Sequence, residues 1–196
     1  MTALIVIVVL VVLIVGWVIM TYNRLVALRT QVANGWAQID VQLKRRYDLI
    51  PNLVESVKGY MGHEQDTLRQ VIEARNKAVA ANPGTGPATG ATAATIAAES
   101  ALTASIGKMF ALAEAYPDLK ANQSVQQLME ELSSTENKIG FARQYYNDTA
   151  TALNTAVQSF PGNLIAGQFA FQNAELWRVA ESERAAVEVA PKVSLR

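Results

Sequence analysis

The hydrophobic pattern of the chain starts with one unbroken apolar run. Residues 3–20 are 18 consecutive residues that include no charged side chain. As a helix this run would be about 27 Å long, which matches the hydrocarbon core of a bilayer. Aromatic rings at the end of such a run favour the membrane interface. We therefore predict a transmembrane anchor over residues 1–22, with these residues as its membrane-anchoring positions: Leu4, Ile5, Val6, Ile7, Leu10, Leu13, Ile14, Trp17, Ile19 and Tyr22.

A cleaved signal peptide is the main alternative for the apolar run. It would need a basic segment before the run and a small-x-small cleavage site after it. No Lys or Arg precedes the run, and Thr21-Tyr22-Asn23-Arg24 follows it, so we expect an uncleaved anchor. Arg24 and Arg29 lie directly behind the run. The positive-inside rule then places the N-terminus outside and the remaining domain in the cytoplasm.

Beyond the anchor, apolar residues recur at three- and four-residue steps, which predicts helices and no strands. The first helix is expected to continue from the membrane to about Asp48. Pro51 restricts the residue before it and lacks an N–H donor, so the chain should turn between Asp48 and Asn52. A second helix with a heptad pattern is predicted over residues 52–81. The Gly- and Pro-rich residues 82–92 predict a flexible loop.

Two further helices complete the predicted domain. The alanine-rich residues 91–116 predict a third helix with Leu102, Ile106, Met109, Phe110 and Ala113 facing inward, and residues 122–160 predict a fourth and longest one. Short breaks between amphipathic helices are typical of antiparallel neighbours. We expect an all-α fold in which residues 23–160 form an elongated up-down bundle of about four long helices. Residues 161–196 should form a short, partly helical or irregular tail.

Several polar residues occupy positions where the helical pattern calls for apolar side chains. Burying an unpaired charge is costly, so each should find a partner or reach solvent. One hypothesis is that these residues pair across helices and fix the register of the bundle. The alternative is that their long stems carry the polar groups to solvent. The residues concerned are Arg46, Glu64, Arg75 and Tyr146, with Glu131, Asn137, Arg143 and Asn147 on the fourth helix as candidate partners.

Bulky apolar residues also gather around the start of the tail. If four helices alternate in direction, the fourth ends facing the membrane, and these side chains would lie near the bilayer surface. Alternatively they cover one end of the bundle or pack against a neighbouring subunit. These interface candidates are Phe160, Leu164, Ile165, Phe169, Phe171 and Trp177.

Composition and motifs exclude most kinds of chemistry. The chain holds 17 basic and 17 acidic residues, and a zero net charge argues against nucleic-acid binding. It has no cysteine, and His63 is its single histidine, so thiolate and histidine metal sites are excluded. The glycine-rich stretch after Asn82 is not followed by the Lys-Ser/Thr pair that a phosphate-binding loop requires. We therefore expect no catalytic residue, no cofactor, no metal and no small-molecule substrate, although a hydrolase using carboxylates alone stays open.

Several residue strings in both halves of the chain form a recognisable pattern, and the most specific of them is Arg45-Arg46-Tyr47-Asp48-Leu49-Ile50-Pro51-Asn52. This pattern resembles the LemA family of bacterial membrane proteins. The resemblance covers the chain from the anchor to about Phe171. It implies a single-pass protein of the bacterial cytoplasmic membrane with a cytoplasmic helical bundle, and it transfers no catalytic or metal residue. Its other segments are residues 22–29, 36–54, 57–60, 63–64, 74–75, 142–148 and 160–166.

Together these features predict a non-enzymatic, membrane-anchored scaffold that forms homo-oligomers in the plane of the membrane. Tethering to one plane raises the effective concentration of copies, and apolar surface on the third helix and the tail would support self-association. Two alternatives stay open. The protein could be an accessory or regulatory subunit of a membrane enzyme, with a membrane protein as partner, or it could shape membranes through the tail aromatics.

Overall fold

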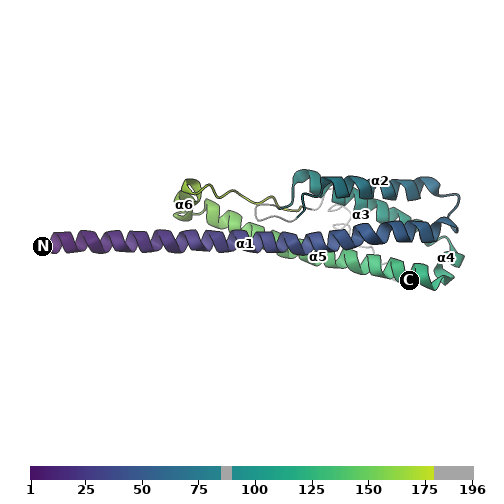
Figure 1. Ribbon diagram of the computed structural model, residues 1–196, viewed down its shortest axis with the longest axis horizontal. Coiled ribbons are helices and arrows are strands. Elements are labelled where there is room, and N and C mark those ends of the chain that lie inside the picture. The colour runs from purple at the N-terminus through teal and green to yellow at the C-terminus, as the bar shows by residue number, and fades with distance from the viewer. Residues whose placement is uncertain (85–89, 179–196) are drawn as a thin grey trace, which may run out of the picture. The chain divides into compact units, whose positions relative to one another are not determined.

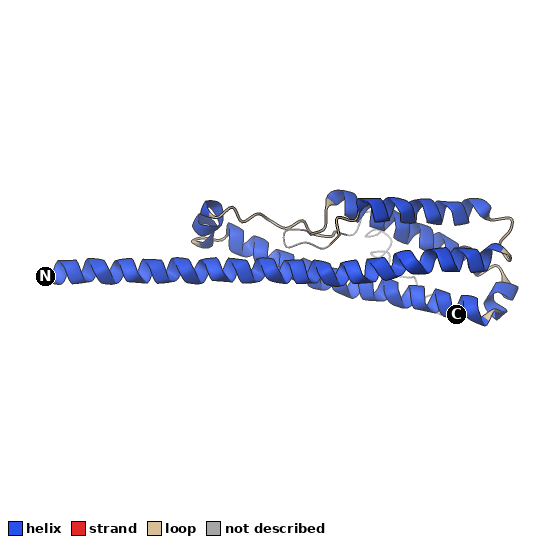
Figure 2. Cartoon of the chain, viewed as in Figure 1, coloured by secondary structure: helices blue, strands red, loops and turns tan. Residues whose placement is uncertain are grey.

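All regular structure in the described part of the chain is helical. Figure 1 shows the computed structural model, which describes residues 1–84 and 90–178, and Figure 2 shows helices and loops but no strand among them. This confirms the predicted all-α fold with a long apolar N-terminal helix packed against other long helices. The helices are α1 (Thr2–Lys58), α2 (Gln65–Ala81), α3 (Ala93–Ala113), α4 (Pro117–Ala121), α5 (Gln123–Gln158) and α6 (Gly162–Gln168).

The predicted turn at Pro51 is wrong, because α1 continues through this proline to Lys58. A proline inside a helix leaves the carbonyl four residues earlier without its helical donor. Here that carbonyl belongs to Tyr47, and the Arg75 Nε donates a hydrogen bond to it at 3.2 Å. A side chain from α2 therefore replaces the missing backbone donor. Residues 52–58 belong to α1, and the second helix begins at Gln65 rather than at Asn52.

The chain divides into two compact units, and α1 and α5 each contribute a part to both. Within the described residues, unit 1 comprises residues 1–44, 84, 90–91 and 135–176, and unit 2 comprises residues 45–83, 92–134 and 177–178. In unit 1 the buried face of α1 follows the predicted three- and four-residue steps. Its buried apolar residues include Val32, Trp36, Ile39, Leu43, Ile139, Tyr146 and Leu153.

Unit 2 buries the apolar faces of α2 and α3 against each other, together with the last turns of α1 and the first turns of α5. Thr92 begins α3 as a cap, since its hydroxyl accepts the N–H of Thr95 at 3.1 Å. The Asn122 side chain caps α5 in the same way through the N–H of Ser124 at 3.0 Å. The buried side chains of unit 2 include Ile50, Leu53, Val57, Met61, Val71, Leu102, Ile106, Met109, Leu119 and Leu132.

Candidate functional site

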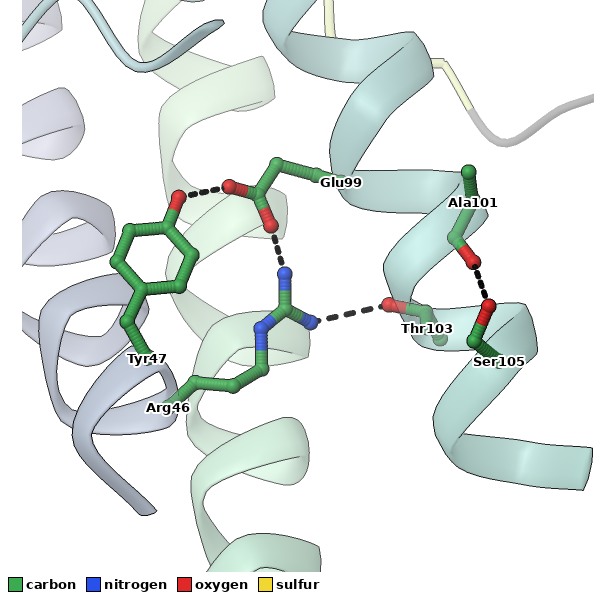
Figure 3. Close-up of polar contacts among 6 residues, drawn as sticks. All are labelled: Arg46, Tyr47, Glu99, Ala101, Thr103 and Ser105. Atoms are coloured by element: carbon green, nitrogen blue, oxygen red, sulfur yellow. Dashed lines mark hydrogen bonds and ion pairs between the residues drawn. The ribbon is translucent and has the colours of Figure 1, made fainter. Parts of the chain in front are cut away.

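The most polar buried site lies in unit 2, where α1 meets α3. Arg46 of α1 forms an ion pair with Glu99 of α3, and both side chains are only 1% exposed. The Arg46 guanidinium also donates to the Thr103 hydroxyl at 3.0 Å. The Tyr47 hydroxyl donates to the second Glu99 oxygen, so both carboxylate oxygens accept a bond (Figure 3). We call Arg46, Tyr47, Glu99 and Thr103 the Arg46–Glu99 cluster.

This cluster is suited to holding two helices in one register. Two charges taken out of water regain their hydration energy only through good geometry and further hydrogen bonds, and this cluster supplies both. A shift of α3 along α1 by one turn would separate the charges by about 5.4 Å. Both carboxylate oxygens are already bonded to protein donors, which is typical of a structural ion pair rather than of an acid or base that meets a substrate.

Sequence reasoning singled out Arg46 but missed Glu99. The signal was nevertheless present in the third predicted helix. Its inward positions Leu102, Ile106 and Met109 follow alternating steps of four and three, and one further step backward from Leu102 reaches Glu99. The same pattern continues to Thr95, which is also buried. An acidic residue on the apolar face of an alanine-rich helix predicts a buried basic partner.

The other polar candidates of unit 2 also find partners, but not the expected ones. Glu64 accepts a hydrogen bond from the Tyr116 hydroxyl at 3.3 Å, and Arg75 donates to the Tyr47 carbonyl. The expectation that their partners lie on the fourth helix is therefore wrong. Glu131 does lie on α5 and pairs with Arg45, and the two side chains are 41% and 49% exposed. Of the other candidates on α5, Asn137 is exposed, whereas Arg143 and Asn147 are half-buried.

Tyr146 organises the polar contacts of unit 1. Its ring is fully buried and lies edge-on to Trp36 at 6.1 Å between ring centroids. Its hydroxyl accepts the N–H of Ala91 at 3.2 Å and donates to the Glu175 carbonyl at 2.8 Å. Burial raises the pKa of this phenol, the hydrogen bond from Ala91 lowers it, and the charge of Glu175 raises it further.

The side chains around Tyr146 bind segments of the chain that are not helical. The Trp36 indole donates to the Gly84 carbonyl at 2.8 Å, while Tyr146 binds Ala91. Asn154 bonds the backbone of Ala174 twice, with its amide donating at 2.9 Å and its oxygen accepting at 2.7 Å. We call Trp36, Tyr146 and Asn154 the Tyr146 cluster. It holds the chain on both sides of residues 85–89 and the segment after α6.

The apolar residues around the start of the tail fall into two groups. Ile165 and Phe171 are buried in a small core with Leu25 of α1, onto which Trp17 and Tyr22 pack. The ring centroid of Tyr22 lies 4.9 Å from that of Phe169 and 5.8 Å from that of Phe171, and the Arg29 guanidinium lies over the Phe171 ring at 5.1 Å. Trp177 is also buried, whereas three other candidates are exposed, namely Phe160, Leu164 and Phe169.

Among the described residues, two helices, α1 and α3, are long and apolar enough to cross a membrane by length and composition. They differ in burial. The apolar stretch of α1 has no buried residue, whereas α3 buries six residues in unit 2, Glu99 among them. Packing in the core of unit 2 is sufficient to explain the apolar character of α3. On α1, by contrast, the large apolar side chains from Leu4 to Val15 are all exposed.

Within the described residues, no group of three His, Asp or Glu side chains could hold a metal ion. A shallow hollow of about 390 Å³ lies between α1 and α5 in unit 1. Its most exposed apolar members are Phe141 at 73%, Val41 at 60% and Tyr145 at 42%. Three large apolar side chains that face water together are typical of an interaction surface.

Comparison with known proteins gives a consistent set of relatives. The model of the LemA family matches residues 35–190. Protein LemA of Metamycoplasma hominis is 26% identical over 167 residues, which cover 85% of this chain and 73% of that protein. Magnetosome protein MamQ 2 of Paramagnetospirillum magneticum is 25% identical over 179 residues, covering 82% of this chain and 65% of its own length. Magnetosome protein MamQ of Magnetospirillum gryphiswaldense is 23% identical over 176 residues, which cover 80% of this chain and 64% of that protein.

Proposed function

This chain belongs to the LemA family, and from this premise we propose that it is a membrane-anchored scaffold that associates with further copies of itself in the membrane plane. We propose that the protein is located in the bacterial cytoplasmic membrane. The apolar run of α1 would cross it once, and the rest of the chain would lie on the cytoplasmic side. Arg24 and Arg29 directly behind the run support this orientation.

The observation that carries the proposal is the exposure of the apolar run. Large side chains such as Leu4 at 68% and Ile14 at 59% face outward, and none of the run's best 18-residue window is buried in the described chain. Soluble proteins rarely leave apolar surface of this extent in water. A lipid environment removes that cost, and a helix satisfies its own backbone there.

The hollow at Val41, Phe141 and Tyr145 supports self-association. Sequence reasoning placed the excess apolar surface on the third helix and the tail. The large apolar side chains of α3 are buried or half-buried, whereas Phe160, Leu164 and Phe169 around the start of the tail are exposed. The hollow adds a further exposed apolar surface on α1 and α5. Lys138, Gln38 and Gln42 border the hollow and would form a polar rim, as is usual at protein interfaces.

Disulfide crosslinking in native membranes tests the proposal, because the chain has no cysteine of its own. Phe141→Cys should give a disulfide-linked dimer on mild oxidation. Val79→Cys is the matched control, since Val79 is an exposed apolar residue on α2, outside the hollow. If both variants gave only monomers, and the protein also had a monomeric mass in lipid nanodiscs, the scaffold proposal would be wrong.

The accessory-subunit alternative gives a different result in the same preparation. A partner of another sequence bound at the hollow would shield Phe141 from homodimer formation and would copurify in a fixed ratio after mild detergent extraction. Phe141→Asp would then release that foreign subunit. In the scaffold, Phe141→Asp would dissociate the homomer, because a charge in an apolar interface is costly to bury.

A further inference from the structure

The corner formed by the last turn of α5 and by α6 sits beside the end of the apolar run. Trp17 and Val18 belong to that run, and both pack onto the core of Ile165 and Phe171. Trp17 precedes the end of the run at Met20 by three residues, or about 4.5 Å along the helix. The corner therefore lies at the depth where the run leaves the hydrocarbon core.

The composition of this corner fits such a depth. Residues 149–174 are 26 consecutive residues without a charged side chain, the longest such stretch after the anchor. Within it, Phe160 is 80% exposed, Leu164 60% and Phe169 50%. Exposed large apolar side chains in a stretch of sequence without charges are costly in water but suited to the boundary of headgroups and acyl chains.

A cavity of about 400 Å³ opens between this corner and α1. The residues that line it include the apolar Trp17 and Phe160, the basic Arg24, and the polar Thr155 and Ser159. Within the described residues, the Arg24 guanidinium makes no hydrogen bond or ion pair. A guanidinium can donate two parallel hydrogen bonds to a phosphodiester, and Thr and Ser residues of the same lining carry hydroxyls that can donate further ones.

We propose that this corner is a second membrane contact, in which Phe160, Leu164 and Phe169 enter the interface and the adjoining cavity takes an anionic phospholipid headgroup beside Arg24. This inference rests on the proposed membrane anchor. The anchor fixes the depth, the uncharged stretch lowers the cost of entering the interface, and Arg24 lies at the level of the lipid phosphates. The helical part would then be tilted and held against the bilayer by two contacts rather than tethered by one.

Spin labels on single cysteines test the depth of the corner. The full-length chain is placed in nanodiscs of phosphatidylcholine and phosphatidylglycerol, with labels at Phe160, Leu164 or Phe169. Labels at Leu10 in the anchor and at exposed Gln144 on α5 serve as controls. The corner labels should be relaxed more by oxygen than by a water-soluble nickel chelate, as at Leu10, and Gln144 should show the reverse.

The controls separate the two levels of the proposal. Corner labels that behave like Gln144, while Leu10 reports lipid, would overturn the second contact and leave the anchor intact. A Leu10 label that reports water would remove the anchor, and the proposed function with it.

Thermal unfolding tests the headgroup site. In neutral detergent, phosphatidylglycerol should raise the Tm of the wild-type chain by a few degrees more than phosphatidylcholine does, because a ligand of the folded state stabilises it. Arg24→Gln should abolish the difference. Arg69→Gln removes the same charge from an exposed position on α2 and should preserve it.

Two results would overturn the lipid assignment. Equal shifts with both lipids would show that no anionic headgroup is recognised. An equal shift with inorganic phosphate would show a site for free anions rather than for lipid.

Discussion

The two units solve the problem of buried polar groups in different ways. Unit 2 buries a full ion pair, Arg46 with Glu99, and both side chains are 1% exposed. Unit 1 buries a neutral phenol, Tyr146, whose hydroxyl bonds only to backbone groups. Arg46 and Tyr146 both lie on long helices, α1 and α5. The type of secondary structure therefore does not explain the difference, which comes from what each unit has to hold in place.

Unit 2 joins helices, whose backbone groups are already bonded within each helix. Its remaining problem is register, and opposite charges on two helices fix register well because a shift separates them. Unit 1 has to hold non-helical chain at Gly84, Ala91 and Ala174. The backbone N–H and C=O groups there need partners from outside, and neutral side chains that both donate and accept supply them.

The largest expected effect comes from breaking the ion pair of unit 2. Glu99→Ala leaves the Arg46 guanidinium buried without its counter-charge, so we expect a loss of about 3–5 kcal/mol in the free energy of unfolding. Chemical denaturation followed by circular dichroism measures this loss. Glu55→Ala removes an acid of an exposed pair on α1 and should cost no more than about 0.5 kcal/mol.

A double variant distinguishes a cost of burial from a loss of attraction. Arg46→Leu with Glu99→Leu removes both charges, and most of the stability lost in Glu99→Ala should return. If the register depends on the pair, the double variant will unfold less cooperatively while its unfolding midpoint recovers. A loss below about 1 kcal/mol in Glu99→Ala would contradict the buried ion pair itself.

A smaller effect is expected from the neutral cluster of unit 1. Tyr146→Phe leaves the buried Ala91 N–H and the part-buried Glu175 carbonyl without this partner, and a buried group left unsatisfied costs about 1–3 kcal/mol. Tyr145→Phe is the matched control, since its neighbouring hydroxyl is on an exposed ring and it should change stability by no more than about 0.5 kcal/mol. Equal losses in the two variants would contradict the role given to Tyr146.

The close approach of α1 and α5 in unit 1 can be tested at a glycine. A Cβ at Gly35 would lie 3.2 Å from the Tyr146 Cα, which is backbone and cannot rotate away. Gly35→Ala should therefore destabilise the chain by about 1 kcal/mol, because the clash outweighs the gain in helix propensity. Gly140→Ala meets nothing within 4 Å and should instead stabilise the chain by up to about 1 kcal/mol.

The smallest effect concerns alkaline pH. The raised pKa of Tyr146 means that the folded chain keeps a phenolic proton that the unfolded chain releases above about pH 10. The contribution of this group to stability is complete below about pH 10 and is lost as the pH rises through the folded-state pKa. The stability difference between wild type and Tyr146→Phe should shrink over that range. If the stability difference between the two proteins instead grew with pH, the pKa of Tyr146 would have to be lowered on folding, which would contradict this prediction.

Local pattern was sufficient for some features of the chain. Three- and four-residue steps predict helices because neighbouring turns of one helix must present a common apolar face. The uncharged run before Thr21 and the breaks at Asn82 and Pro161 follow equally from nearby residues alone. The buried residues of α1, such as Trp36, Ile39 and Leu43, follow the same three- and four-residue steps.

Other features depend on which segments meet in the folded chain. The sequence marked Arg46 and Tyr146 as polar residues on apolar faces, but it could not name Glu99 or the Glu175 carbonyl as partners, because many registers satisfy one periodic pattern. Pro51 shows the same limit of prediction from sequence. Local chemistry predicts a break there, and Arg75, 24 residues later, supplies the donor that lets α1 continue. The apolar face of a helix follows from spacings of a few residues, whereas the bonding of a buried polar group, and with it the continuation of α1 through Pro51, is decided by what the tertiary structure places beside it.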